Sequence, residues 1–171
     1  MNIKHIPTRK LALALSVVLA IAACKPEKPE SPANTPPPNE EELITSVRAY
    51  FTHSITNEVV EFSWVDADGD GGNAPMITGG ELQPGATYAV SLLLLNETES
   101  PADTISNEVA AEAEEHQFFF STTGGSLTWV SYGDADPNGL PVGLVTEWST
   151  SVAGAGDLTI ILRHEPNKSA A

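Results

Sequence analysis

Two loops of the chain repeat one spacing of oxygen-bearing side chains. Each fits the pattern D-x-D-x-[DN]-G, the first half of a calcium-binding loop, in which alternate side chains turn their oxygens toward one hard cation and the glycine makes the bend. The closing glutamate of an EF-hand is absent, because Ile77 and Val145 stand at its position. The candidate calcium ligands are Asp66, Asp68 and Asp70 in the first loop and Asp134, Asp136 and Asn138 in the second.

A structural interpretation of the two loops stays open beside calcium. Asp, Asn and Gly favour tight turns, because their short polar side chains bond to neighbouring backbone amides. Several carboxylates within one short loop repel one another unless a cation lies among them, and this repulsion favours the calcium interpretation.

Histidines supply a second group of candidate ligands. His116 begins one predicted strand and His164 ends another, so the two imidazoles meet at one end of a sheet if these strands are antiparallel neighbours. Glu115 and Glu165 stand beside them in the sequence. Imidazoles with a carboxylate suit zinc or copper, so these four residues form a predicted transition-metal site. The alternative is that each histidine ends its strand in solvent.

Motifs typical of catalysis are missing from the sequence. It contains no G-x-S-x-G nucleophile elbow and no phosphate-binding glycine loop before a helix. We therefore expect that the protein is not an enzyme. A surface glycan hydrolase is a further alternative, and it would require two carboxylates facing one cleft.

The stretch that ends at Cys24 has the three parts of a secretory signal. Lys4, Arg9 and Lys10 give a positive start, and 13 mostly apolar residues (11–23) follow. The sequence Ile-Ala-Ala-Cys at 21–24 resembles a bacterial lipobox. This resemblance implies cleavage before Cys24 and attachment of acyl chains such as palmitate, and several chains together form a stable membrane anchor.

The charge of the chain agrees with attachment through lipid alone. Removal of residues 1–23 leaves five basic and 23 acidic residues, a net charge of −18. That charge excludes most roles in nucleic-acid binding and repels an anionic membrane surface. Lys25 follows the cysteine where an Asp would retain a lipoprotein in the inner membrane. We expect a lipid-anchored protein of the outer membrane, on its periplasmic or cell-surface face.

The remainder divides into a spacer and one domain. Residues 24–42 hold the lipidated cysteine and a segment with six prolines, which predicts an extended spacer. In residues 43–171, short alternating segments separated by glycine-rich turns predict an all-β fold, an immunoglobulin-like β-sandwich of about seven strands with one short inserted helix at 102–115. An up-and-down barrel is the alternative. The segment 87–96 is apolar on both faces, so we expect a central strand buried on both sides.

Three short segments carry a resemblance to known proteins. The sequences DADGDGGN at 66–73, EEHQFFF at 114–120 and RHEPNKSA at 163–170 resemble a group of small bacterial lipoproteins that are often labelled type 1 periplasmic binding fold proteins. The group has no established activity, and the strand-rich pattern of this chain disagrees with the label.

These observations together predict a membrane-anchored lipoprotein with a non-enzymatic β-sandwich. We expect this domain to bind a metal ion or a small ligand and to serve an outer-membrane transporter or another surface protein. The alternative is an adhesion or structural surface module whose loops are stiffened by calcium.

Overall fold

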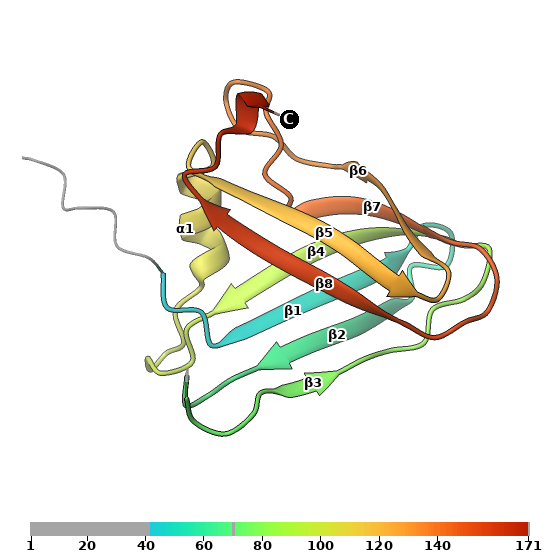
Figure 1. Ribbon diagram of the computed structural model, residues 1–171, viewed down its shortest axis with the longest axis horizontal. Coiled ribbons are helices and arrows are strands. Elements are labelled where there is room, and N and C mark those ends of the chain that lie inside the picture. The colour runs from blue at the N-terminus through green and yellow to red at the C-terminus, as the bar shows by residue number, and fades with distance from the viewer. Residues whose placement is uncertain (1–41, 70, 171) are drawn as a thin grey trace, which may run out of the picture. The chain divides into compact units, whose positions relative to one another are not determined.

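Residues 42–69 and 71–170 are described by the computed structural model of the chain (Figure 1). The predicted signal peptide, Cys24, the spacer up to residue 41 and Asp70 lie outside the described residues.

In this described part of the chain, eight antiparallel strands form two sheets. The first sheet has six strands in the order β3-β2-β1-β4-β7-β6, and the second sheet pairs β5 with β8. The strands of the first sheet are β1 (Ser46–His53), β2 (Val59–Val65), β3 (Met76–Thr78), β4 (Thr87–Leu95), β6 (Leu127–Tyr132) and β7 (Val145–Thr150). Those of the second sheet are β5 (His116–Gly124) and β8 (Gly156–His164).

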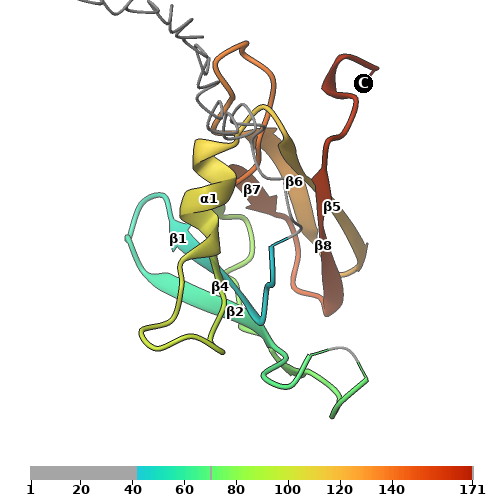
Figure 2. The same ribbon diagram turned by 90° about the vertical axis from the view of Figure 1, so that its left-hand side faces the viewer.

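The hydrophobic core lies between the two layers, which Figure 2 shows from the side. Phe51 on β1 pairs in register with Val90 on β4, and both side chains are buried. Phe118 reaches the same core from β5. Trp148 on β7 is also buried, and its indole N–H donates a hydrogen bond to the hydroxyl of Thr146 at 2.8 Å. The alternation of apolar residues along each strand thus produces one core.

The one α-helix among the described residues, α1 (Ile105–Ala111), is short and packs against β4 through Ile105 and Val109. It is shorter than the predicted helix at 102–115, and residues 112–115 form a turn instead. The last turn of α1 contains no basic residue, and glutamates follow it. Negative charge at this end opposes the helix dipole and favours an early end to the helix.

The predicted all-β sandwich with one inserted helix is confirmed. Its strands divide six to two, more unequally than the four and three of an immunoglobulin constant domain. The strand missing from the prediction is β3, which has three exposed residues. The central position of β4 is confirmed, but its burial on both sides is wrong, because Leu93 and Leu95 point away from the core and are half-buried. Within the described ranges, no helix has the length and apolar character needed to cross a membrane.

Candidate functional site

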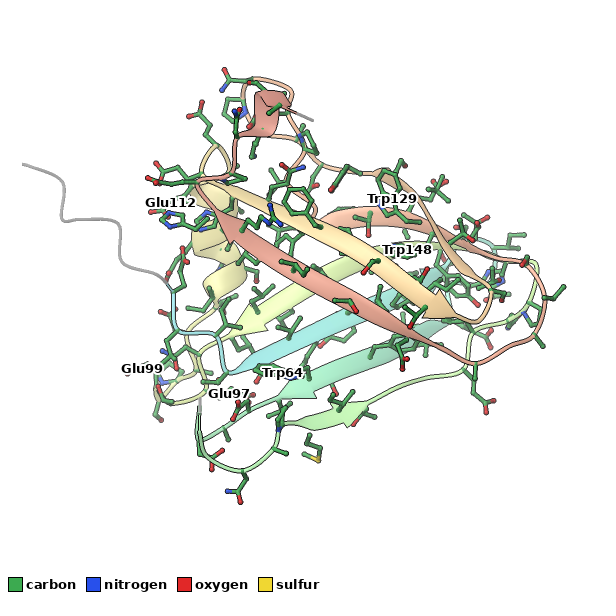
Figure 3. All side chains as sticks on the ribbon, in the orientation of Figure 1. Trp64, Glu97, Glu99, Glu112, Trp129 and Trp148 are labelled. Carbon is green, nitrogen blue, oxygen red and sulfur yellow. The ribbon has the colours of Figure 1, made fainter. Side chains whose placement is uncertain are left out.

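The two predicted histidines meet at the end of the second sheet. His116 and His164 are register partners on β5 and β8, and their rings stack with centroids 5.0 Å apart and planes at 23°. The prediction that antiparallel pairing would bring the two imidazoles together is therefore confirmed. Glu112, which follows α1, lies at this same end of the molecule (Figure 3).

His116 is fully buried, and its surroundings determine which nitrogen carries a proton. Nδ1 lies 3.1 Å from the backbone carbonyl oxygen of Glu112. A carbonyl oxygen only accepts hydrogen bonds, so Nδ1 must be the protonated donor. In the neutral ring, Nε2 therefore carries the lone pair.

The lone pair of His116 Nε2 faces a carboxylate. Oε1 of Glu42 lies 3.0 Å from Nε2, and the Glu42 side chain is itself only 9 % exposed. No described residue forms an aligned hydrogen bond with Nε2. Two lone pairs at this distance repel each other, so the arrangement requires a proton or a metal ion between Nε2 and Oε1.

Each of the two stacked rings belongs to a group of ligand atoms. The group around the buried His116, here called the buried group, also contains the half-buried Glu42 and the exposed Glu112, and the outer group consists of Glu115, His164 and Glu165. Within each group the ligand atoms lie within 4.8 Å of one another. In the outer group, Nε2 of His164 lies 3.7 Å from Oε2 of Glu115, and the His164 side chain is 22 % exposed.

The structure thus separates the four predicted transition-metal ligands into two groups. Glu115, His164 and Glu165 lie together, while His116 faces Glu42 and Glu112. The sequence analysis missed these last two residues. Glu112 stands four residues before His116 where the helix was expected to continue, and this spacing could have indicated it. Glu42 gave no signal, because it belonged to the predicted spacer.

The second acidic loop uses its carboxylates to bind its own backbone. Asp134 accepts hydrogen bonds from the amides of Gly143 (2.7 Å) and Val145 (3.0 Å). Asp136 accepts the amides of Asn138 and Leu140, both at 2.9 Å. These contacts agree with the turn-forming interpretation of the loop.

A lysine ammonium group lies where the second loop would need a cation. Lys168 begins a short 3-10 helix, η1 (Lys168–Ala170), and its Nζ lies 3.1 Å from Oδ2 of Asp136, with both side chains buried. Nζ also donates to the carbonyl oxygen of Ala113. The side-chain amide nitrogen of the third predicted ligand, Asn138, donates a hydrogen bond to the carboxylate of Glu114. Calcium at this loop stays a prediction, and binding would require displacement of the ammonium group.

The pKa of Asp136 reflects this environment. Burial alone would raise the pKa, but the hydrogen bonds from Leu140, Lys168 and Asn138 and the charge of Lys168 together outweigh burial and lower it. The carboxylate therefore stays ionised and holds the loop to the end of the chain.

The first acidic loop is described in part. Asp66 accepts the amide of Gly69 at 3.0 Å, and Asp68 accepts the amide (3.0 Å) and the side-chain nitrogen (2.7 Å) of Asn73. The backbone hydrogen bond from Asn73, followed by that from its side chain, lowers the pKa of Asp68. The third predicted ligand, Asp70, lies outside the described residues, so calcium in this loop also stays a prediction.

Comparisons of the chain with protein-family models, with curated proteins and with solved structures found no match. The resemblance to small bacterial lipoproteins therefore stays a prediction from three short segments.

Proposed function

We propose that the chain is a lipid-anchored outer-membrane protein whose β-sandwich binds a transition-metal ion, zinc or copper, without catalysing a reaction. The observation that carries this proposal is the buried Nε2 of His116, which faces the carboxylate of Glu42 at 3.0 Å and has no aligned hydrogen-bond partner among the described residues. The lipobox resemblance at Cys24 supports the anchor.

The chemistry of the buried group suits a borderline-soft cation. Zinc binds imidazole nitrogen and carboxylate oxygen at about 2.0–2.2 Å, so two ligand atoms of one tetrahedral ion lie roughly 3.3–3.6 Å apart. The Nε2 to Oε1 distance of 3.0 Å is a few tenths of an ångström shorter, so a small side-chain movement would admit the ion. Nδ1 of His116 donates a hydrogen bond to the backbone carbonyl of Glu112, and this bond would direct Nε2 toward the ion. Metal-binding histidines commonly have such a hydrogen-bonded partner at their other ring nitrogen. Glu112 offers a further carboxylate.

The outer group places further charged side chains beside this site. Glu115, His164 and Glu165 lie next to the buried group, and each is more exposed to solvent than His116. A cation that approaches from solvent meets these ligands and the exposed Glu112 before it meets His116. We propose that the protein passes its ion to an outer-membrane transporter or another surface protein through this exposed group.

Titration of the chain with zinc chloride and with copper(II) chloride tests the proposal, with binding measured by calorimetry and stability by urea unfolding. Zinc at about 100 times its Kd should raise the free energy of unfolding by about 2.7 kcal/mol. Glu42→Gln retains the shape of the side chain but removes a charged ligand, so we expect it to weaken binding by about tenfold or more.

Glu99→Gln is the matched control, because Glu99 is an exposed carboxylate outside both ligand groups (Figure 3). It removes the same charge and should leave the Kd almost unchanged. Absence of zinc and copper binding below millimolar concentration would show that a proton and not a metal ion lies between His116 and Glu42, and the metal function would then be wrong. Equal losses in Glu42→Gln and Glu99→Gln would show only general attraction to an acidic surface.

A further inference from the structure

An apolar cleft of about 670 Å³ lies between the layers, beside β8. Its walls include Phe62 and Trp64 from β2, Ile77 from β3, and Leu158 and Ile160 from β8. This volume falls within the range of about 300–1,000 Å³ that is typical of ligand sites. The cleft is separate from the ligand groups around the histidines, since it contains none of their residues.

Burial decreases across the second layer from β5 to β8. Phe118 on β5 is 1 % exposed, whereas its register partner on β8, Leu162, is only half-buried. On the larger sheet, Ile77 lines the cleft and yet is 74 % exposed. In Figure 1, β8 crosses over β1 and β2, while β3 lies beyond the area that the second layer covers. The six-to-two division of strands therefore leaves β3 uncovered and the inner face of β2 only partly covered.

The free edge of β8 presents backbone hydrogen-bonding groups. Just past the last pair of the ladder, the amide of Glu165 donates to the carbonyl of Glu115 at 2.6 Å. Hydrogen-bonded and non-bonded pairs alternate along an antiparallel ladder, so every second amide of β8 points away from β5. In that alternation, the outward-pointing amides are those of Leu158, Ile160 and Leu162.

The two edges of the second layer differ in how these groups are satisfied. On β5 the outward amide of Phe118 donates to the carbonyl oxygen of Val142 at 2.7 Å. On β8, no strand among the described residues pairs with the outer edge. Unpaired amides and uncovered apolar side chains thus occur together beside β8, and a strand laid along this edge would satisfy both.

We propose that an extended peptide segment of a partner protein adds to the free edge of β8 as the third strand of the second layer. Its main chain bonds to the outward groups of β8, and every second side chain enters the cleft, as in other cases of recognition by strand addition. The positions that enter the cleft are apolar. Those between them lie on the solvent side with Asp157 and Arg163 of β8, and we take them as basic from the net charge of the domain, because residues 42–171 contain three basic and 19 acidic residues. This interaction does not depend on metal binding.

An eight-residue peptide of alternating valine and lysine tests the inference against the full chain. Binding is measured by calorimetry and by tryptophan emission, since Trp64 lines the cleft and the peptide contains no tryptophan. We expect saturable binding with an emission change that Trp64→Phe removes. N-methylation of every second peptide amide preserves the side chains but prevents strand pairing, and it should weaken binding by about tenfold or more.

A matched pair of variants places the interaction in the cleft. Ile77→Lys adds a positive charge and removes an apolar contact at an exposed position, so it should weaken peptide binding by about tenfold without unfolding the chain. Val152→Lys makes the same change in charge at a position that is 70 % exposed and lies outside the cleft, and it should alter the Kd by less than about twofold.

Three outcomes would overturn the proposal. Equal binding of the N-methylated and unmodified peptides would exclude strand addition. A Trp64 response to dodecanol but not to the peptide would assign the cleft to a small amphiphile. A concentration-dependent dimer that Ile77→Lys dissociates, together with no peptide binding, would show that a second copy of the chain covers the cleft.

Discussion

Replacement of Gly143 by alanine tests how tightly the second acidic loop packs against the core. Gly143 is buried and has a φ of 101°. A Cβ atom at this position would lie 2.8 Å from Cβ of Phe118 and 3.0 Å from Cε1 of Tyr132. Both distances are well below the optimal carbon–carbon separation of about 3.5–4.0 Å, so the core would have to move.

Two costs add in Gly143→Ala. Positive φ costs an L-residue about 1–2 kcal/mol, and overpacking of a filled core costs about 1–3 kcal/mol. We therefore expect the free energy of unfolding to fall by about 2–5 kcal/mol. Small domains have a total of about 5–15 kcal/mol, so the loss should be easily measured.

Gly139→Ala is the matched control in the same loop. Gly139 also has a positive φ, 81°, but its Cβ would meet nothing within 4 Å. This variant should lose only the backbone cost of about 1–2 kcal/mol. Urea unfolding followed by tryptophan fluorescence gives both values, with m expected to stay constant. If Gly143→Ala is no more destabilised than Gly139→Ala, the reasoning from close packing is refuted.

Two further predictions concern the carboxylates of the acidic loops. The pKa values of Asp68 and Asp136 are lowered by folding, so both groups contribute stability above their unfolded pKa of about 3.9, and this contribution is lost as the pH falls through their folded values. The urea concentration at the midpoint of unfolding should therefore decrease below about pH 4. A midpoint that stays constant down to about pH 2 would contradict the lowered pKa values. Lys168→Met leaves Asp136 buried without its ammonium partner, so we expect lower stability that millimolar calcium partly restores. Lys168→Arg retains a cation beside Asp136 and should not respond to calcium in this way. An equal effect of calcium on the unchanged chain would show that the ammonium group does not occupy a cation position.

The sequence predicted the structure well where the alternation of apolar and polar residues determines a strand. Alternation located seven of the eight strands, but β3 is too short and exposed to show it. The His116–His164 contact could be predicted because both residues stand at strand ends and antiparallel pairing brings such ends together. Glu42 and Lys168 could not be predicted as partners, because each reaches its site from a segment with no strand or helix pattern, through contacts that only the folded chain creates.

The pairing of β5 with β8 also bears on the order in which the molecule assembles. Between these two strands the chain passes through β6 and β7, which belong to the other sheet. Closure of the β5–β8 ladder therefore spans a long loop, and such non-local pairings form slowly. The two imidazoles come together only when this ladder closes. An ion bound at them would stabilise contacts that form late, so it should slow unfolding and leave the folding rate almost unchanged.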